Sequence, residues 1–178
     1  MFGPSDLWFA ALRLTAVVVI LVTTVPLTAA TEQEIMAAYV VNILRLSHRK
    51  TTAASGDLNL CLIRPGKVEQ PLHSLENSLV KARRLKVRSV KKNDIAGCEV
   101  LYFGDSSGLQ NAIAKAQSMD ILTIGNDGEF LSVSGMVALV VENRRMVVEI
   151  SKAALNQSSW AFSSHLLEIA RVTQEGVR

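Results

Sequence analysis

The sequence predicts an α/β fold, arranged as a layered sandwich with a mixed, mostly parallel sheet, an antiparallel hairpin at one edge and helices on both faces. Three observations support this prediction. Short apolar runs typical of buried strands recur along the chain, and segments with apolar residues three and four positions apart separate them. Two further runs, 136–141 and 146–150, are joined by only four residues. Strands separated by helices favour parallel pairing, whereas closely joined strands favour a hairpin.

The first element expected is a helix that begins at Thr31. Glu34 lies three residues later, as in a capping box, and the apolar spacing should carry the helix to about Ser47. The segments expected next are a polar loop at 51–57, a buried strand at 58–63, a second helix over 72–82 and a half-exposed strand at 85–88.

The second part of the chain continues the alternation. Cys98 is expected to begin an apolar strand that ends at Phe103, and Ser163 is expected to cap a final helix that runs through Val172. Between them we expect a helix over 109–119, a short strand at 121–124, a turn at 125–128, the hairpin, and a helical turn at 151–156.

Residues 1–30 have the features of a secretory signal peptide. A run from Leu14 to Leu27, interrupted only by three threonines, follows an arginine and precedes three small residues. This pattern predicts cleavage after Ala30 and export of the protein. A retained membrane anchor is the competing interpretation, but a spanning helix needs about 20 apolar residues and this run contains Pro26.

Residues 31–178 have the size of one domain, large enough to bury a core that does not depend on disulfides for folding. The formal net charge of the chain is +3, and so small a basic excess does not predict nucleic-acid binding.

The chain contains two cysteines, Cys61 and Cys98. Export places them in an oxidising compartment, where a pair is more often bridged than free. We therefore predict an intramolecular disulfide between them, and two buried thiols packed as small hydrophobic side chains are the alternative. Metal binding is not expected, because the sequence has no Cys-x-x-Cys or paired-histidine spacing.

No combination of residues predicts an enzyme. Ser106 and Ser107 follow a strand, but the Gly-x-Ser-x-Gly pattern of a nucleophile elbow is absent. Glu142, Glu149 and Glu168 are too dispersed for an acid–base pair, and exposed surface positions explain them. We predict no catalytic residues, no metal and no cofactor.

The loop that follows the strand ending at Phe103 is the candidate site for a small ligand. Loops after parallel strands gather at one edge of a sheet and present helix N-termini to anions. The candidate residues are Asp105, Ser106 and Ser107. An ordinary helix N-cap is the alternative that we favour, because Ser and Asp are preferred at that position.

The strongest charge feature is a basic segment with seven cations among twelve residues. These cations would stabilise a helix C-terminus and protect an edge strand, or they would bind an acidic partner, anionic lipid or a cell-wall polymer. The alternation around Leu85 and Val87 favours the structural role, because it is typical of a solvated strand face. The basic segment consists of Lys81, Arg83, Arg84, Lys86, Arg88, Lys91 and Lys92.

Four blocks, which together cover nearly all of residues 31–178, match a known family in order and spacing. The blocks are Ala38-Tyr39 with Asn42-Ile43-Leu44; Leu60-Cys61-Leu62 with Gly97-Cys98-Glu99-Val100-Leu101-Tyr102; Ile121 to Val137; and Val148 to Ser151 with Ser163 to Val172. In these blocks the chain resembles the YfiR-like family of periplasmic regulators, a family of domains of unknown function. It departs from the family at 47–50, where a Trp-Pro pair is usual, at Ser134 and Ser151, and in lacking a second cysteine pair.

The resemblance implies a periplasmic, non-enzymatic repressor. Such a protein binds the periplasmic sensor domain of an inner-membrane diguanylate cyclase and inhibits it, which lowers cyclic-di-GMP output and biofilm formation. An outer-membrane lipoprotein that sequesters the regulator would release this inhibition. The basic segment is the candidate contact with the cyclase, and exposed apolar residues on one amphipathic helix would allow a homodimer. The alternative function is that of a periplasmic binding protein for an anionic small molecule.

Overall fold

The computed structural model describes residues 30–50 and 55–174. The predicted signal peptide therefore lies outside the described residues apart from Ala30, as does part of the predicted loop at 51–57. Within the described residues no helix is long and apolar enough to cross a membrane. The helices are α1 (Glu32–Leu46), the 3-10 turn η1 (Gly66–Val68), α2 (Glu69–Ser74), α3 (Gln110–Ser118), α4 (Lys152–Asn156) and α5 (Ser164–Ile169).

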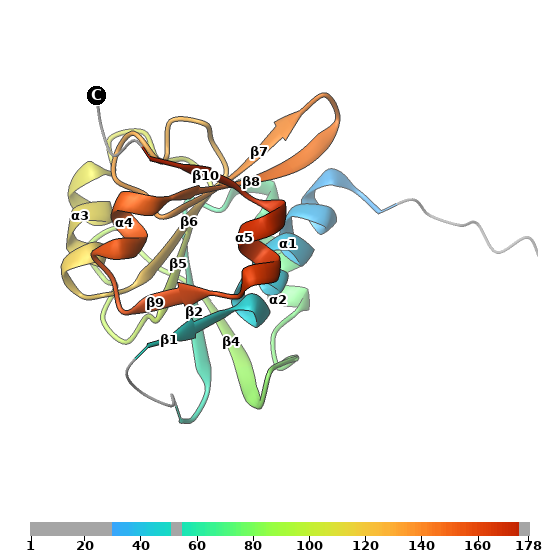
Figure 1. Ribbon diagram of the computed structural model, residues 1–178. Coiled ribbons are helices and arrows are strands. Elements are labelled where there is room, and N and C mark those ends of the chain that lie inside the picture. The colour runs from blue at the N-terminus through green and yellow to red at the C-terminus, as the bar shows by residue number, and fades with distance from the viewer. Residues whose placement is uncertain (1–29, 51–54, 175–178) are drawn as a thin grey trace, which may run out of the picture.

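The strands form one large curled sheet and one small sheet (Figure 1). Their bounds are β1 (Ser47–Arg49), β2 (Leu58–Ile63), β3 (Leu79–Val80), β4 (Arg83–Ser89), β5 (Val100–Phe103), β6 (Leu122–Gly125), β7 (Val137–Glu142), β8 (Arg145–Ser151), β9 (Trp160–Phe162) and β10 (Arg171–Thr173). The large sheet has the order β10-β8-β7-β6-β5-β2-β4-β3, and β1 pairs with β9 in the small one.

The predicted fold class is confirmed. The pairs joining β4, β2, β5, β6 and β7 are parallel, whereas β7 and β8 form the predicted antiparallel hairpin. The three-residue strand β10 pairs in parallel with β8 on its outer side, so the hairpin lies one strand in from the edge of the sheet.

Residues that alternate along the central strands separate two hydrophobic cores. In β5, Tyr102 packs into the core beneath α1, α2 and α5, whereas Phe103 packs into the core beneath α3. In β2, Leu60 and Cys61 divide in the same way. Because successive side chains of a strand point to opposite faces, the apolar run at 58–63 belongs to a strand that is buried on both faces.

The opening helix forms as its capping box predicts. The Thr31 hydroxyl accepts a hydrogen bond from the Glu34 amide at 3.3 Å, and the Glu34 carboxylate accepts one from the Thr31 amide at 2.7 Å. The hydrogen bonds from the backbone and side chain of Thr31 lower the pKa of Glu34.

The predicted second helix over 72–82 is wrong in its extent. The helix α2 covers only Glu69–Ser74, and the chain then turns into the two-residue strand β3. Asn77 and Lys81 both have positive φ, which interrupts a helix and returns the chain along β4 as a hairpin. Leu79, expected on the buried face of a helix, is 64% exposed.

The predicted final helix is also too long, and the strand predicted from Cys98 begins later. The helix α5 ends at Ile169, after which β10 pairs with β8. The backbone of β10 thereby forms sheet hydrogen bonds with β8 that a longer helix could not form. The Cys98 amide donates to the carbonyl of Ile95 in a turn, so that β5 begins only at Val100.

The predicted disulfide between Cys61 and Cys98 is present. Their Cα atoms are 5.8 Å apart, within the usual span of a disulfide, and both side chains lie in the core beneath α3. The bond fixes the segment that connects β4 to β5 against the middle of β2.

Candidate interaction surfaces

The structure divides the basic segment into two groups. Four of its cations bind acceptors of the same chain: Arg83 to the Glu99 carboxylate, Lys81 to the Ser47 carbonyl, Lys86 to the Asn77 side chain, and Arg88 to the Ala96 carbonyl. The remaining three, Arg84, Lys91 and Lys92, are exposed and form no ion pair or side-chain hydrogen bond within the described residues.

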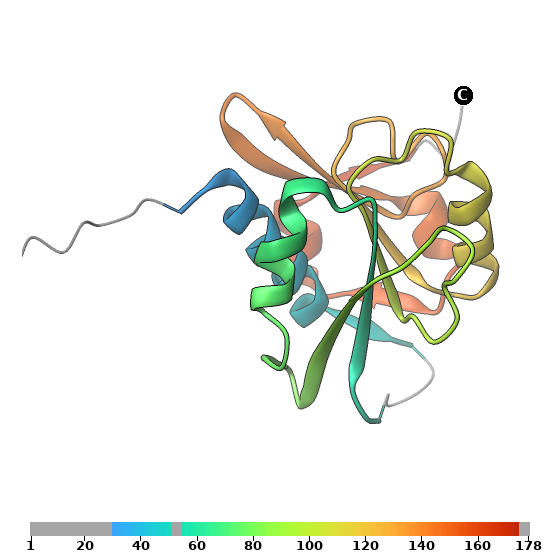
Figure 2. The same ribbon diagram turned by 180° about the vertical axis from the view of Figure 1, so that it is seen from behind.

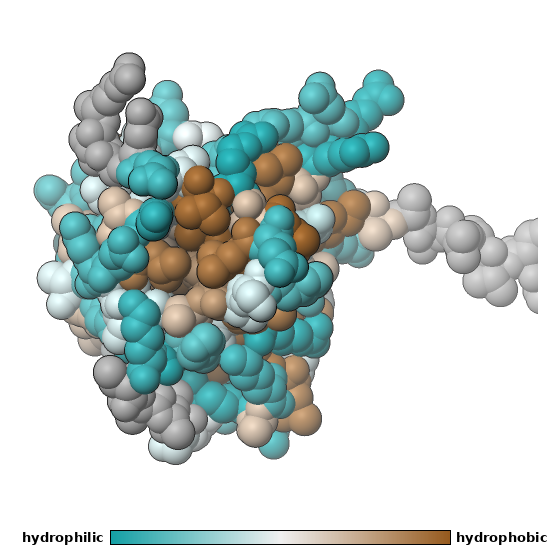
Figure 3. Space-filling model, viewed as in Figure 1, coloured by the Kyte–Doolittle hydropathy of each residue, from teal (hydrophilic) through white to brown (hydrophobic). Residues whose placement is uncertain are grey.

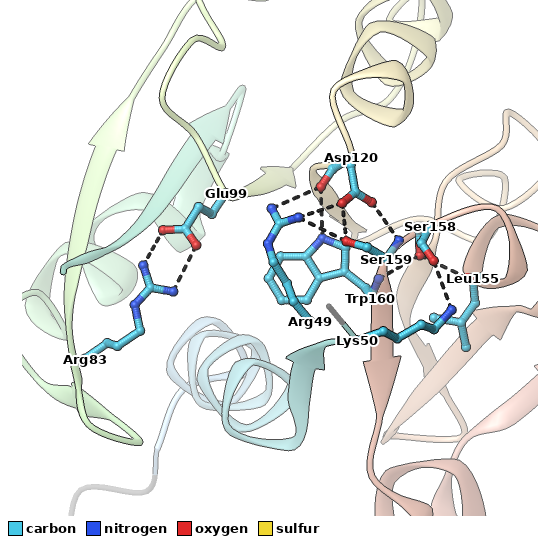
Figure 4. A network of polar contacts seen from close by, with 9 residues as sticks. All are labelled: Arg49, Lys50, Arg83, Glu99, Asp120, Leu155, Ser158, Ser159 and Trp160. Atoms are coloured by element: carbon cyan, nitrogen blue, oxygen red, sulfur yellow. Dashed lines mark hydrogen bonds and ion pairs between the residues drawn. The ribbon is translucent and has the colours of Figure 1, made fainter. Parts of the chain in front are cut away.

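Arg83 has a structural role. Its guanidinium binds both oxygens of the Glu99 carboxylate, with an Nη1 to Oε2 distance of 2.9 Å (Figure 4). It also donates to the carbonyls of Gly56 and Asp57. A planar guanidinium that binds a carboxylate through two donors forms one of the stronger ion pairs available to a protein, so Arg83 joins the start of β4 to the start of β5.

The loop at 104–107 is held by its own side chains rather than by capping of α3. The N-cap of α3 is Leu109, which provides no side-chain cap, so the N-cap explanation of Asp105, Ser106 and Ser107 is wrong. Asp105 instead accepts hydrogen bonds from the amide and hydroxyl of Ser107. These hydrogen bonds, that from the Ser107 side chain above all, lower the pKa of the Asp105 carboxyl.

The loop faces a cavity of about 460 Å³ that is lined by carboxylates. Asp105, Asp127 and Glu129 all contribute to it, and Asp127 accepts from the Ser106 amide at 3.3 Å. Arg64 lies 3.6 Å from Asp105 and partly offsets its charge. An anion placed here would meet three negatively charged side chains, so the charge of the cavity does not favour the anionic ligand that the sequence suggested.

The geometry offers no support for a hydrolase at Ser106. Ser106 is buried, and within the described residues no hydrogen bond connects it to a histidine. In the same part of the chain no group of three or more His, Cys, Asp or Glu side chains is arranged to hold a metal ion.

A second surface, which sequence analysis did not single out, consists of exposed apolar side chains on the side of the sheet that α1 and α5 cover. Figure 3 shows apolar residues gathered on this side, in the region that β10, α4 and α5 surround. We define the apolar face by the exposed large apolar side chains of α1, β7, α5 and β10, which are Ile35, Val141, Leu167, Ile169 and Val172.

The sheet register shows that the strand residues of the apolar face lie on this side. Val172 is paired with the buried Ile150, so the two side chains project to the same side of the sheet. Val141 lies two positions beyond Leu139, which also packs beneath α1. Ile169 is 60% exposed on α5, the helix that contacts α1. Four elements therefore present apolar side chains to solvent on one side, an arrangement typical of protein interaction sites.

A polar network holds β1 and β9, which support this side of the molecule (Figure 4). Asp120 follows α3 and accepts hydrogen bonds from Arg49 at 2.6 Å and from the Ser159 amide at 2.9 Å. The Arg49 guanidinium lies 4.7 Å from the ring centre of Trp160, whose Nε1 donates to the Asp120 carbonyl at 3.0 Å. This network joins three segments that are far apart in the sequence.

Comparison with known proteins identifies the family. A model described as YfiR/HmsC-like matches residues 33–171, which is most of the chain. The chain belongs to the YfiR/HmsC-like family. This membership covers every element from α1 to the start of β10, including both cysteines, and it agrees with the resemblance drawn from the sequence. A YfiR/HmsC-like chain is a member of a family of periplasmic regulators, which suggests a regulatory rather than a catalytic role.

Other comparisons add little to this assignment. No curated protein matches this YfiR/HmsC-like chain. One solved structure, the ABC domain in complex with L-Trp from Streptococcus pneumonia, is 9% identical, with a TM-score of 0.48 over 65% of this chain and 55% of that chain. The chain thus spans about half the length of that structure, and the similarity is too weak to transfer a ligand or a function.

Proposed function

We propose that this protein is a periplasmic repressor that binds the periplasmic sensor domain of an inner-membrane diguanylate cyclase and lowers cyclic-di-GMP output and biofilm formation. The observation that carries the proposal is the match of the YfiR/HmsC-like family to residues 33–171. Cleavage of residues 1–30 would deliver the protein to the periplasm. An outer-membrane lipoprotein that binds the repressor would release the cyclase.

The apolar face supports a role in binding another protein. Its residues come from α1, β7, α5 and β10, and they remain exposed although α1, β7 and α5 also contribute buried residues to the larger core. Burial of a partner against such a surface removes apolar area from water, which is the main favourable term in protein association. We therefore assign the contact with the cyclase to the apolar face instead of the basic segment named from the sequence.

A binding experiment tests this assignment. Ile169→Glu places a charge at the most exposed position of the apolar face, so affinity for the purified periplasmic domain of the cyclase should fall at least tenfold, the effect expected of an interface hot spot. Thermal unfolding should not change, because surface substitutions alter stability by less than about 0.5 kcal/mol. In cells, the variant should raise cyclic-di-GMP.

Met119→Glu is the matched control, because Met119 is an exposed apolar residue, 43% accessible, that follows α3 on the opposite side of the sheet. It should bind the cyclase domain like the unmodified protein. Equal binding by both variants would show that the apolar face is not the contact. Failure of the unmodified protein to bind any diguanylate cyclase domain would remove the proposed function itself.

A further inference from the structure

We propose that the edge of the sheet formed by β3 and β4 docks onto a lipid bilayer that carries anionic headgroups. This edge combines one exposed apolar side chain with a row of cations, and it is separate from the apolar face. We call it the basic edge; its residues are Leu79, Arg84, Lys86, Arg88, Lys91 and Lys92.

The register of the hairpin places the strand residues of the basic edge on one side. Leu79 is the direct cross-strand partner of Arg84, so both project to the same side of β3 and β4. Lys86 and Arg88 follow at steps of two along β4 and share that side, whereas the intervening Leu85 and Val87 are buried in the core beneath α1. Figure 2 shows β4 at the front of the view, with no helix over its lower half.

The basic edge has a net positive charge even after its internal contacts are counted. The hydrogen bonds of Lys86 to the Asn77 side chain and of Arg88 to the Ala96 carbonyl use neutral acceptors, so neither bond cancels a charge. Lys86 also forms an ion pair with Glu76 at 4.0 Å, which partly offsets its charge. Lys91 and Lys92 extend the row beyond β4 into the following exposed loop, where Asp94 is the acidic residue.

Two features favour a lipid surface over an acidic protein. Leu79 is 64% exposed beside Arg84, so an apolar side chain is available to enter the headgroup boundary while the cation stays among the phosphates. The arginine of the segment best suited to binding one carboxylate in a fixed geometry, Arg83, is already bound to Glu99. Two of the three exposed cations without such contacts, Lys91 and Lys92, are flexible point charges, which suit a diffuse layer of anionic headgroups.

Vesicle sedimentation tests the proposal. The unmodified protein should bind vesicles of phosphatidylcholine mixed with phosphatidylglycerol, should not bind phosphatidylcholine alone, and should be released by salt. Each cation near an anionic leaflet strengthens binding about fivefold, so Arg84→Glu with Lys91→Glu and Lys92→Glu should weaken binding by about 100-fold or more. Leu79→Ser should weaken it further.

A matched control reverses three exposed cations elsewhere: Arg144→Glu, Arg145→Glu and Lys152→Glu. It makes the same change in net charge, and it should retain most of the vesicle binding. Equal loss in both triple variants, or no binding by the unmodified protein at low salt, would overturn the proposal. Equal binding to soluble polyglutamate, with no effect of Leu79→Ser, would also overturn it and would indicate an acidic polypeptide as the ligand. None of these outcomes depends on binding to the cyclase.

Discussion

Asp120 illustrates how much of this fold depends on single residues that local pattern does not reveal. It has positive φ, lies in the turn between α3 and β6, and accepts hydrogen bonds from both Arg49 and Ser159. Partial burial raises the pKa of Asp120, but the hydrogen bonds from Ser159 and the charge of Arg49 outweigh it, so the pKa lies below its ordinary value of 3.8. The folded protein therefore favours the charged carboxylate.

We predict that Asp120→Asn lowers the free energy of unfolding by about 1–2 kcal/mol at pH 7, because it removes a charged acceptor from Arg49 and Ser159. Asn tolerates positive φ, so the backbone conformation should be retained. Urea unfolding measures the effect, and Asp94→Asn is the control, because Asp94 lies in an exposed loop and its side chain forms no hydrogen bond or ion pair within the described residues.

The pH dependence of this difference follows from the lowered pKa. The unfolded chain binds a proton at Asp120 at a higher pH than the folded chain does, so the stabilisation is complete above pH 3.8 and is lost as the pH falls below that value. The gap between the unmodified protein and Asp120→Asn should therefore be constant near neutrality and shrink in acid. A gap that is the same at pH 7 and in acid would mean that Asp120 acts through its shape rather than its charge.

Some of the residues that hold the fold together are predictable from the sequence, and others are not. The pair Cys61 and Cys98 was predictable, because export and cysteine number together favour a bridge. Arg49, Asp120 and Trp160 were not, since 71 residues separate Arg49 from Asp120 and no periodic pattern joins them. Only the folded chain brings these side chains together.

At the scale of elements, the sequence predicted the helices and strands for which the apolar pattern and the capping residues indicate the same structure. The helix α1 and the strand β2 were correct, because a capping box and a continuous apolar run each indicate one structure. The short elements β1, β3, β9 and β10 were missed, because two or three residues give no period, and pairing with a distant strand stabilises them. The apolar residues at 72–82, which are three and four positions apart, belong to a short helix followed by a hairpin and not to one continuous helix.

The disulfide acts at this scale, since it ties the connection between β4 and β5 to β2. It closes a loop of 37 residues, and restricting the unfolded chain in this way contributes about 4 kcal/mol. We predict that Cys61→Ala with Cys98→Ala lowers the unfolding free energy by about this amount, measured in guanidinium chloride. Reduction of the unmodified protein provides the comparison. An unchanged denaturation midpoint after reduction would show that the loop is restrained without the bridge.

At the scale of the whole molecule, two surfaces of different chemistry occupy different parts of the sheet. The apolar face lies at the end of the strand order that contains β7, β8 and β10, whereas the basic edge lies at the opposite end with β3 and β4. β2, β5 and β6 separate the two ends, and their side chains are almost entirely buried. A sheet with such a rigid centre can present both surfaces at once, so that one binds a bilayer while the other binds a protein.

This separation predicts that the two activities are independent. Ile169→Glu should weaken binding to the cyclase domain and leave vesicle binding unchanged. Reversal of the charges of Arg84, Lys91 and Lys92 should weaken vesicle binding and leave binding to the free cyclase domain in solution unchanged. In each binding assay, the variant that combines the changes should show the sum of the binding free-energy changes that the two separate variants show in that assay. The reason is that substitutions at distant sites without shared partners are usually additive within about 0.5 kcal/mol. With the cyclase domain anchored to anionic vesicles, however, the reversal should also weaken its apparent affinity, because membrane binding raises the local concentration of the repressor. If the reversal weakens binding to the free domain as strongly as to the anchored one, the basic edge contacts the cyclase directly and the two surfaces form one interface.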